Sequence, residues 1–319
     1  MKKFRLLIAS VVLLLGTGEM MGAEKKSDFP QGPINYLIAY APGGKTDTQA
    51  RGLLPYVEKY LGVRIVIQNF PGAGGRIGLT KLFKAKPDGY TIGNFPLPAV
   101  VLGEYLASVE YKSKEFTPIF AGFLTRSVLV VAKDTYKSLD ELIKAGRSKP
   151  LTNATSGIGN AVHLASLVTA NGLGLKDVRN VPFNSSAALA ALAGKHVDFA
   201  IAAASNALPL VQAGKLTPLL VIADKRDNAF PQVPIPKELG YKFSAIDTID
   251  GVVGPPNLPI AKVKILEEAF AKAAADPKFL NWAEKAEMTF IPMDHKKYRL
   301  VVEDMVKEVE KYKDILRQQ

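Results

Sequence analysis

The stretch INYLIAYAPGGKTD, residues 34–47, is typical of a β-strand that runs through a glycine-rich loop into a helix. Gly43 and Gly44 let the backbone approach a ligand closely, and Thr46 or Asp47 can cap the helix. Amide donors at such a helix start point into the loop and favour an anion. The same residues also suit a tight strand-to-helix turn without a ligand. A nucleotide phosphate loop is excluded, because its first glycine would fall on an alanine.

Strand-like runs alternate with helical patterns along the rest of the chain, which predicts an α/β fold of parallel strands joined by crossover helices. The predicted strands are Ile34–Tyr40, Arg64–Phe70, Tyr90–Phe95, Ser127–Ala132, Leu151–Ala154, Val178–Phe183, Val197–Ala202 and Thr217–Ile222. The predicted helices are Asp47–Leu61, Gly75–Ala85, Ser138–Gly146, Asn160–Asn171, Ala187–Ala193 and Asn206–Ala213. A last long helix carries an apolar stripe for packing, made of Tyr298, Val302, Met305, Val309, Tyr312 and Leu316.

Small polar residues follow three further predicted strands, in segments 155–160, 184–186 and 205–206. Ligands of open parallel sheets bind at the carboxyl ends of strands, where these segments fall. Hydroxyls and amides at helix starts favour a carboxylate or a phosphate. The glycine cluster at 71–78 fails as a dinucleotide fingerprint, because Ile77 stands where a small residue is needed. We expect that cluster to pack against the first loop.

The chain has 319 residues, 48% of them apolar, a formal charge of +11 and no cysteine. This composition excludes a disordered chain, a disulfide scaffold and a zinc-thiolate protein. Two domains are expected at this length. The basic residues are spread along the chain without a recognition motif, so nucleic acid is not an expected partner. Attraction of anionic solutes is a better use of the charge.

Residues 1–23 have the pattern of a secretory signal peptide. Lys2, Lys3 and Arg5 precede the apolar run Leu6–Leu15, which is too short to span a bilayer, and small residues lead to Ala23. Removal of this segment takes away three basic residues and one acidic residue, which leaves a formal charge of +9. We expect an exported, soluble periplasmic protein without a lipid anchor.

Catalytic patterns are scarce. The sequence has no cysteine nucleophile, no Gly-x-Ser-x-Gly elbow and no His-Glu-x-x-His pair. We therefore predict no catalytic residues, no metal site and no cofactor. Ser156 and His163 leave a periplasmic serine hydrolase as an alternative, which would also need an orienting carboxylate.

Taken in order, the motifs resemble those of the substrate-binding receptors of tripartite tricarboxylate transporters, the Bug family of periplasmic proteins. The resemblance covers nearly the whole chain after the signal peptide, and its order and spacing are specific although each motif alone is weak. It rests on Ala-Pro-Gly-Gly-x-x-Asp at 41–47, Ala50-Arg51, Pro-Gly-Ala-Gly-Gly-x-Ile-Gly at 71–78, Pro-Asp-Gly-Tyr-Thr at 87–91, Ser-Gly-Ile-Gly at 156–159, His163-Leu164, Val-Pro-Phe at 181–183, Ala-Gly-Lys-Leu at 213–216 and Val233-Pro234.

The resemblance implies a two-lobed periplasmic-binding-protein-like fold, each lobe a mainly parallel sheet flanked by helices, with the ligand cleft between the lobes. Crossings near 122–127 and 250–259 give a first lobe of residues 24–124 plus 248–319 and a second lobe of residues 125–247. The double connection suits closure around a ligand. The expected ligand-binding residues are Tyr40, Ala41, Gly43, Gly44, Thr46, Asp47, Thr155, Ser156, Gly157, Asn160, Ser185, Ser186, Ser205 and Asn206.

We therefore expect a monomeric receptor that binds a small carboxylate, mono- or dicarboxylic and including aromatic ones, and delivers it to integral membrane transporter subunits. Asp47 is assigned as a helix cap or water-holder, because a bare carboxylate would repel an anion. Presentation of the ligand to a sensor kinase is a further alternative. The chain departs from the family pattern at Asn184-Ser185, Ala202 and Thr248–Asp250, where the far end of a ligand is read.

Overall fold

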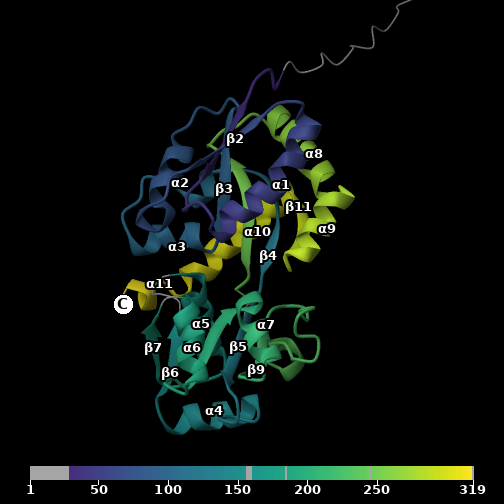
Figure 1. The fold of residues 1–319 in the computed structure, drawn as a ribbon. Coiled ribbons are helices and arrows are strands. Elements are labelled where there is room, and N and C mark those ends of the chain that lie inside the picture. The colour runs from purple at the N-terminus through teal and green to yellow at the C-terminus, as the bar shows by residue number, and fades with distance from the viewer. Residues whose placement is uncertain (1–28, 156–159, 184, 244–245, 318–319) are drawn as a thin grey trace, which may run out of the picture.

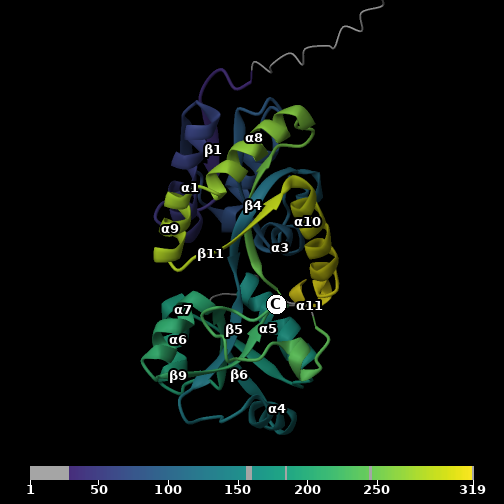
Figure 2. The same ribbon diagram turned by 90° about the vertical axis from the view of Figure 1, so that its right-hand side faces the viewer.

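The computed structural model describes residues 29–155, 160–183, 185–243 and 246–317, which fold into two sheets flanked by helices. The expected signal peptide lies outside the described residues. Figures 1 and 2 show the two sheets in separate lobes, one above the other, with the chain passing between them at the junction of β4 and β5 and again before β10. The fold is thus α/β and two-lobed.

The first sheet has the strand order β11-β4-β10-β3-β1-β2 and draws strands from both ends of the chain. Its strands are β1 (Ile34–Ile38), β2 (Ile65–Asn69), β3 (Thr91–Leu97), β4 (Thr117–Thr125), β10 (Thr248–Gly254) and β11 (Thr289–Asp294). The helices and short 3-10 turns of the same chain segments are α1 (Lys45–Leu61), η1 (Ala73–Gly75), α2 (Arg76–Phe83), α3 (Ala99–Leu106), η2 (Ser113–Glu115), α8 (Ile260–Ala274), α9 (Pro277–Lys285), α10 (His295–Glu310) and α11 (Lys313–Arg317).

The second sheet has the order β7-β6-β8-β5-β9. Its strands are β5 (Ser127–Ala132), β6 (Leu151–Thr155), β7 (Val178–Pro182), β8 (Phe199–Ala203) and β9 (Leu216–Ile222). The accompanying helices and 3-10 turn are α4 (Leu139–Ser148), α5 (Ala161–Gly172), α6 (Ser185–Ala193), α7 (Ala204–Gln212) and η3 (Pro236–Leu239). The division of the chain at 124/125 and 247/248 stays a proposal, which this sheet membership supports.

Both sheets are mixed, with antiparallel strands added to the mainly parallel arrangement that the sequence predicted. In the first sheet β10 is antiparallel to both β3 and β4, and β11 is antiparallel to β4. In the second sheet β5 is antiparallel to β8 and β9. The strands β1, β2 and β3 run in parallel, as do β6, β7 and β8. The strands that follow the two crossings, β5 and β10, run opposite to the parallel strands of their sheets, and so does the edge strand β11.

The C-terminal stripe is confirmed as a packing face, although the helix that carries it is broken. The stripe residues Tyr298, Val302, Met305, Val309, Tyr312 and Leu316 are all buried. Four of them lie on α10 and Leu316 lies on α11, while Tyr312 lies in the turn at 311–312 that separates the two helices. The same apolar cluster contains Phe95 of the first sheet and Leu129 of the second. The C-terminal helices therefore belong to a core that reaches both lobes.

Candidate functional site

The glycine loop of residues 39–44 ends at a helix start that no side chain caps. Helix α1 begins at Lys45, and its N-cap is Gly44, without a side-chain hydrogen bond. The expected cap role of Thr46 or Asp47 was therefore wrong, because both stand inside the first turn. The first amides of a helix have no acceptor within it. This start, at the positive end of the helix dipole, is suited to an oxygen of an anion.

Asp47 holds the loop instead of capping the helix. Its Oδ2 accepts hydrogen bonds from the Gly43 amide at 2.9 Å and from Arg51 Nε at 2.8 Å. Its Oδ1 accepts from Asn69 Nδ2 at 3.1 Å, and the same nitrogen donates to the Tyr40 carbonyl at 3.0 Å. The hydrogen bond from Arg51, with those from Gly43 and Asn69, lowers the pKa of Asp47 to about 2 against the opposing effect of burial. Asp47 is thus ionised, and its oxygens accept hydrogen bonds from the loop, from α1 and from β2.

The second glycine cluster supports this loop, as the sequence predicted. Gly75 has a φ of +96°, and a β-carbon on it would come within 3.0 Å of the Tyr40 hydroxyl. A β-carbon on Gly78 would come within 2.7 Å of the backbone of Ala39. Only glycine admits so close an approach at these two positions. The cluster is therefore a packing surface for the first loop.

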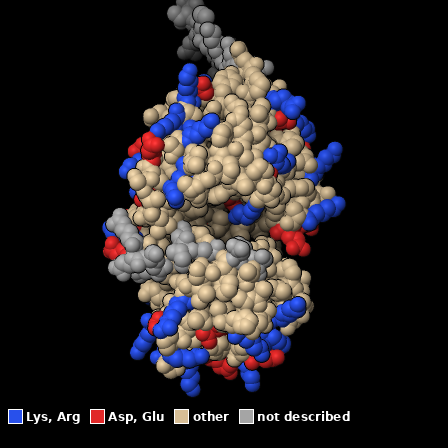
Figure 3. Space-filling view, turned by 60° about the vertical axis from the view of Figure 1, so that its left-hand side comes forward, with Lys and Arg blue, Asp and Glu red and all other residues tan. Residues whose placement is uncertain are grey.

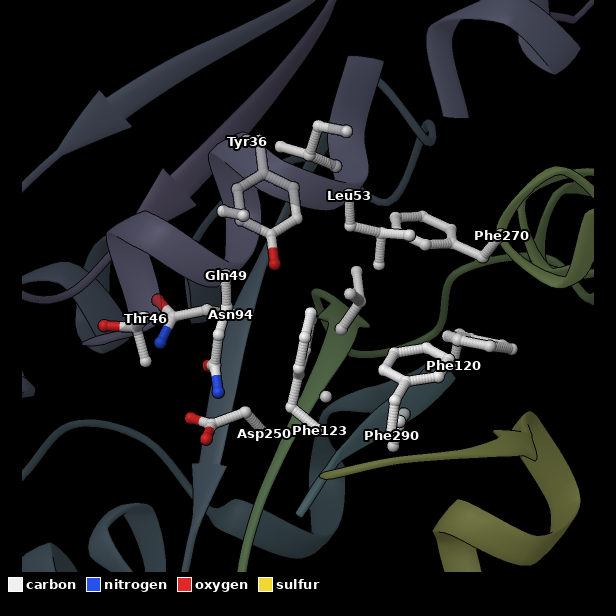
Figure 4. A pocket seen from close by; sticks show the side chains of 16 residues that line it. Tyr36, Thr46, Gln49, Leu53, Asn94, Phe120, Phe123, Asp250, Phe270 and Phe290 are labelled. Carbon is white, nitrogen blue, oxygen red and sulfur yellow. The ribbon is translucent and has the colours of Figure 1, made fainter. Parts of the chain in front are cut away.

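A small cavity of about 30 Å³ lies beneath the start of α1, which is room for about two water molecules. Figure 4 shows polar groups of Thr46, Gln49, Asn94 and Asp250 gathered on one side of it, with aromatic rings on the other. The aromatic side is formed by Phe120, Phe123, Phe270 and Phe290.

Several polar atoms around this cavity lack hydrogen bonds within the described part of the chain. They are Gln49 Oε1, Asn94 Nδ2 and Asp250 Oδ1. The ammonium of Lys45 lies 2.8 Å from Asp250 Oδ2 and forms an ion pair with it. Each buried polar atom left unsatisfied costs about 1–3 kcal/mol, so a guest that supplies hydrogen bonds is favoured here.

The sequence analysis did not select Lys45, Gln49, Asn94 or Asp250, although it noted the family departure at 248–250. The usable signal was the presence of polar side chains inside otherwise apolar strands, Asn94 in β3 and Asp250 in β10. Buried polar side chains of this kind require partners. Their partners are distant in sequence: Asn94 Oδ1 accepts a hydrogen bond from the Ala39 amide at 2.9 Å, and Asp250 pairs with Lys45 of α1.

In the second lobe, the predicted residues lie at the ends of parallel strands. Thr155 ends β6 and is fully buried, while Asn160 caps α5 by accepting a hydrogen bond from the His163 amide at 2.9 Å. Ser185 and Ser186 begin α6, and the exposed Ser205 and Asn206 lie in the first turn of α7. Ser156 and Gly157 lie outside the described residues, and of the alternative hydrolase pair only His163 is described.

Strand register brings both sets of loops to the crossing between the lobes. In the first sheet, Leu97 at the end of β3 pairs with Ile249, just after the return crossing. In the second, Ala203 at the end of β8 pairs with Ser127, just after the first crossing. The neighbouring β1 and β6 are parallel to β3 and β8, so their carboxyl ends share these edges. Figure 3 shows the surface hollowed between the two lobes.

Among the described residues, no group of three or more His, Cys, Asp or Glu side chains is arranged to hold a metal ion. No helix in the described ranges is long and apolar enough to cross a lipid bilayer.

Comparison with known proteins gives a family match over residues 50–318, to the family described as "Tripartite tricarboxylate transporter family receptor". The chain is 30% identical to the Cupriavidus necator protein named "UPF0065 protein in gbd 5'region", over 94% of this chain and 92% of that one. It is 29% identical to "Protein BugT" of Bordetella pertussis, over 85% and 89% of the two chains.

Three solved structures share the fold. A TctC solute-binding protein from Polaromonas superimposes with a TM-score of 0.82 at 23% identity, covering 91% of this chain and all of the other (100%). The periplasmic binding protein BugD superimposes with a TM-score of 0.71 at 26% identity, covering 90% of this chain and 98% of the other. MatC from Rhodopseudomonas palustris with bound malate gives 0.70 at 26% identity, covering 91% and 100%. The first of these matches shows the fold alone.

Proposed function

We propose that this chain, which belongs to the tripartite tricarboxylate transporter receptor family, is a periplasmic solute receptor that binds a small carboxylate between its lobes. The family is one of substrate-binding receptors and not of enzymes. In this proposal the lobes close over the ligand, and the monomeric receptor delivers it to integral membrane transporter subunits. The predicted signal peptide at residues 1–23 would direct its export.

The observation that carries the proposal is the shared edge at the crossing. The start of α1, with an N-cap that makes no side-chain hydrogen bond, lies at the carboxyl ends of β1 and β3. The starts of α5, α6 and α7 follow the ends of β6, β7 and β8 at the facing edge. Two sets of helix starts on opposite lobes suit an anionic ligand held from both sides. The bound malate of the MatC structure is a ligand of this chemistry.

A thermal-shift panel of mono- and dicarboxylates on the purified mature protein tests the proposal. A ligand at a hundredfold excess over its Kd stabilises the folded state by about 2.7 kcal/mol, which raises the melting temperature by roughly 5–10 °C. Absence of any shift, together with turnover of an ester or amide, would replace the receptor by the hydrolase alternative.

A valine at Gly44 tests the helix start directly. A β-carbon there meets only the Ala41 carbonyl oxygen, at 3.3 Å, and Gly44 has an ordinary φ of −75°. We therefore expect Gly44→Val to fold, to cover the α1 amides and to abolish the ligand-induced shift. Gly32→Val is the matched control, since a β-carbon there meets no atom within 4 Å. Undiminished affinity in Gly44→Val would refute the assignment of this loop.

A further inference from the structure

Asp250 is a buried carboxylate at the edge of the cleft. Its residue is 6% exposed, and it lies two positions after Thr248, which pairs with Thr125 at the crossing. Its charge, added to the effect of burial, raises the pKa of Tyr36 and Tyr40 above the usual value. A negative charge therefore faces the same region as the start of α1, where an anion is expected to bind.

Lys45 covers this carboxylate from the solvent side. Its ammonium lies 2.8 Å from Asp250 Oδ2 and 3.5 Å from Thr125 Oγ1, while 45% of the side chain is exposed. A partly exposed lysine is a compact charge on a flexible stem and reorients readily. A ligand that approaches α1 from the cleft therefore meets Lys45 first, and it reaches the buried carboxylate of Asp250 when the lysine side chain turns away.

The cavity behind the pair is short of donors. Two of its unpartnered atoms are acceptors, Asp250 Oδ1 and Gln49 Oε1, and one is a donor, Asn94 Nδ2. The other oxygen of Asp250 has only the ion pair with Lys45. An ammonium group has three N–H donors and no acceptor. It also has about the size of a water molecule, of which the 30 Å³ cavity has room for about two. A second carboxylate would instead bring acceptors and a like charge to Asp250.

We infer that Lys45 and Asp250 form a pair that selects a zwitterionic ligand, an amino carboxylate whose ammonium contacts Asp250 and whose carboxylate contacts Lys45 and the α1 amides. The inference rests on the proposed function and narrows its ligand class. Binding exchanges the internal ion pair for two intermolecular ones. A dicarboxylate of the same length lacks the ammonium and is discriminated against.

Matched ligand pairs measure this selectivity by isothermal titration calorimetry at pH 7. The probes are succinate with β-alanine, glutarate with 4-aminobutyrate, and adipate with 5-aminopentanoate, each pair differing by a carboxylate in place of an ammonium. Butyrate is the probe without a second charge. The wild-type protein is expected to bind the amino member of at least one pair tenfold or more tightly than the diacid.

Asp250→Asn is expected to weaken the affinity for the amino member of the pair at least tenfold and to change the affinity for butyrate by less than threefold. The ratio of the affinities for the amino member and the diacid should fall. Asp276→Asn is the matched control. Asp276 is equally buried, its Oδ2 lies 3.0 Å from the ammonium of the exposed Lys59, and neither residue lines the cavity. That control should lose thermal stability without a change in selectivity.

The outcomes separate the two proposals. If no carboxylate of either kind binds the wild-type protein, the receptor function itself fails. If diacids bind the wild-type protein as tightly as their amino partners, or if Asp250→Asn leaves the ratio unchanged, the zwitterion inference is overturned and the receptor function stands. The wild-type ratio is decisive even where the Asp250 variant does not fold.

Discussion

Replacement of Asp47 by asparagine tests how much the glycine loop depends on one charge. The carboxylate accepts hydrogen bonds from Gly43, Arg51 and Asn69, at 2.8 to 3.1 Å. Its pKa falls from 3.8 to about 2 on folding, which corresponds to at most about 2.5 kcal/mol at 1.36 kcal/mol per unit. The Arg51 side chain is 53% exposed, and screening of that partner reduces the expected loss to about 1–2 kcal/mol.

The sign of the pH dependence follows from the lowered pKa. The stabilisation is fully present above pH 3.8 and is lost as the pH falls through about 2. Asp47→Asn should therefore unfold at lower urea than the wild-type protein at pH 7, and the gap should shrink by pH 3. Trp282 is the one tryptophan of the chain and reports on this lobe, because its ring lies against Gly52 of α1.

Asp304→Asn provides the control for this experiment, since its side chain is 74% exposed and pairs with Lys307 three residues on. Asp304→Asn is expected to lower the free energy of unfolding by less than about 0.5 kcal/mol. The reasoning on Asp47 is refuted if Asp47→Asn matches the wild-type urea midpoint at pH 7, or if the gap between them is the same at pH 7 and pH 3.

Two further substitutions probe the crossing and the loop support. Burial raises the pKa of Asp247 to about 7 despite the nearby charge of Arg126. Between pH 4 and pH 7 the native state therefore binds a proton that the unfolded state has lost. The free energy of unfolding should fall as the pH rises through this range, by up to about 1.4 kcal/mol per pH unit. Asp247→Asn should flatten that part of the urea-midpoint profile, and an unchanged slope would contradict the assignment. Gly78→Ala would place a β-carbon 2.7 Å from the Ala39 backbone and should cost about 1–3 kcal/mol in urea unfolding. Gly32→Ala, with no atom near its β-carbon, should stay within about 0.5 kcal/mol of wild type, and equal costs for the two would refute overpacking.

Local patterns predicted the elements that depend on neighbours in sequence. The strand, loop and helix of residues 34–61 came out in the right order, although α1 begins two residues early because Gly44 serves as its N-cap. The predicted helix Ser138–Gly146 is present as α4, and Ser138 caps it by accepting a hydrogen bond from the Glu141 amide. The apolar stripe of the C-terminal helices is buried throughout. In each case the residues that form the pattern and the element that they predict lie close together in the sequence.

The strands β4, β10 and β11 were missed because their glycines and prolines resemble breaks in a strand pattern. A β-carbon on Gly122 of β4 would come within 2.4 Å of the Phe290 ring, and one on Gly251 of β10 within 2.3 Å of the Tyr298 ring. Both glycines make room for aromatic rings from distant segments. Helices α3, α8 and α9 were also not predicted, and α8 and α9 pack against α1, which lies about 200 residues earlier in the sequence.

The candidate site was predicted where backbone chemistry defines it and missed where side chains from distant elements meet. Glycine spacing was enough to select the loop at 39–44, because conformation there depends on adjacent residues. The Lys45–Asp250 pair joins positions about 200 residues apart, so only the antiparallel return of β10 beside β3 brings them together. Residues that discriminate between ligands belong to this second class.

Net charge therefore says little about selectivity. Near the glycine loop, Lys45 is paired with Asp250 and Arg51 with Asp47, so neither cation adds a free charge at short range. The remaining excess of basic residues in the +11 chain is spread along the sequence, and its field is screened beyond about 8 Å at physiological salt. Such a field speeds the approach of anions without distinguishing them. Discrimination must come from groups inside that distance, where the buried carboxylate of Asp250 favours one charge and the start of α1 favours the other.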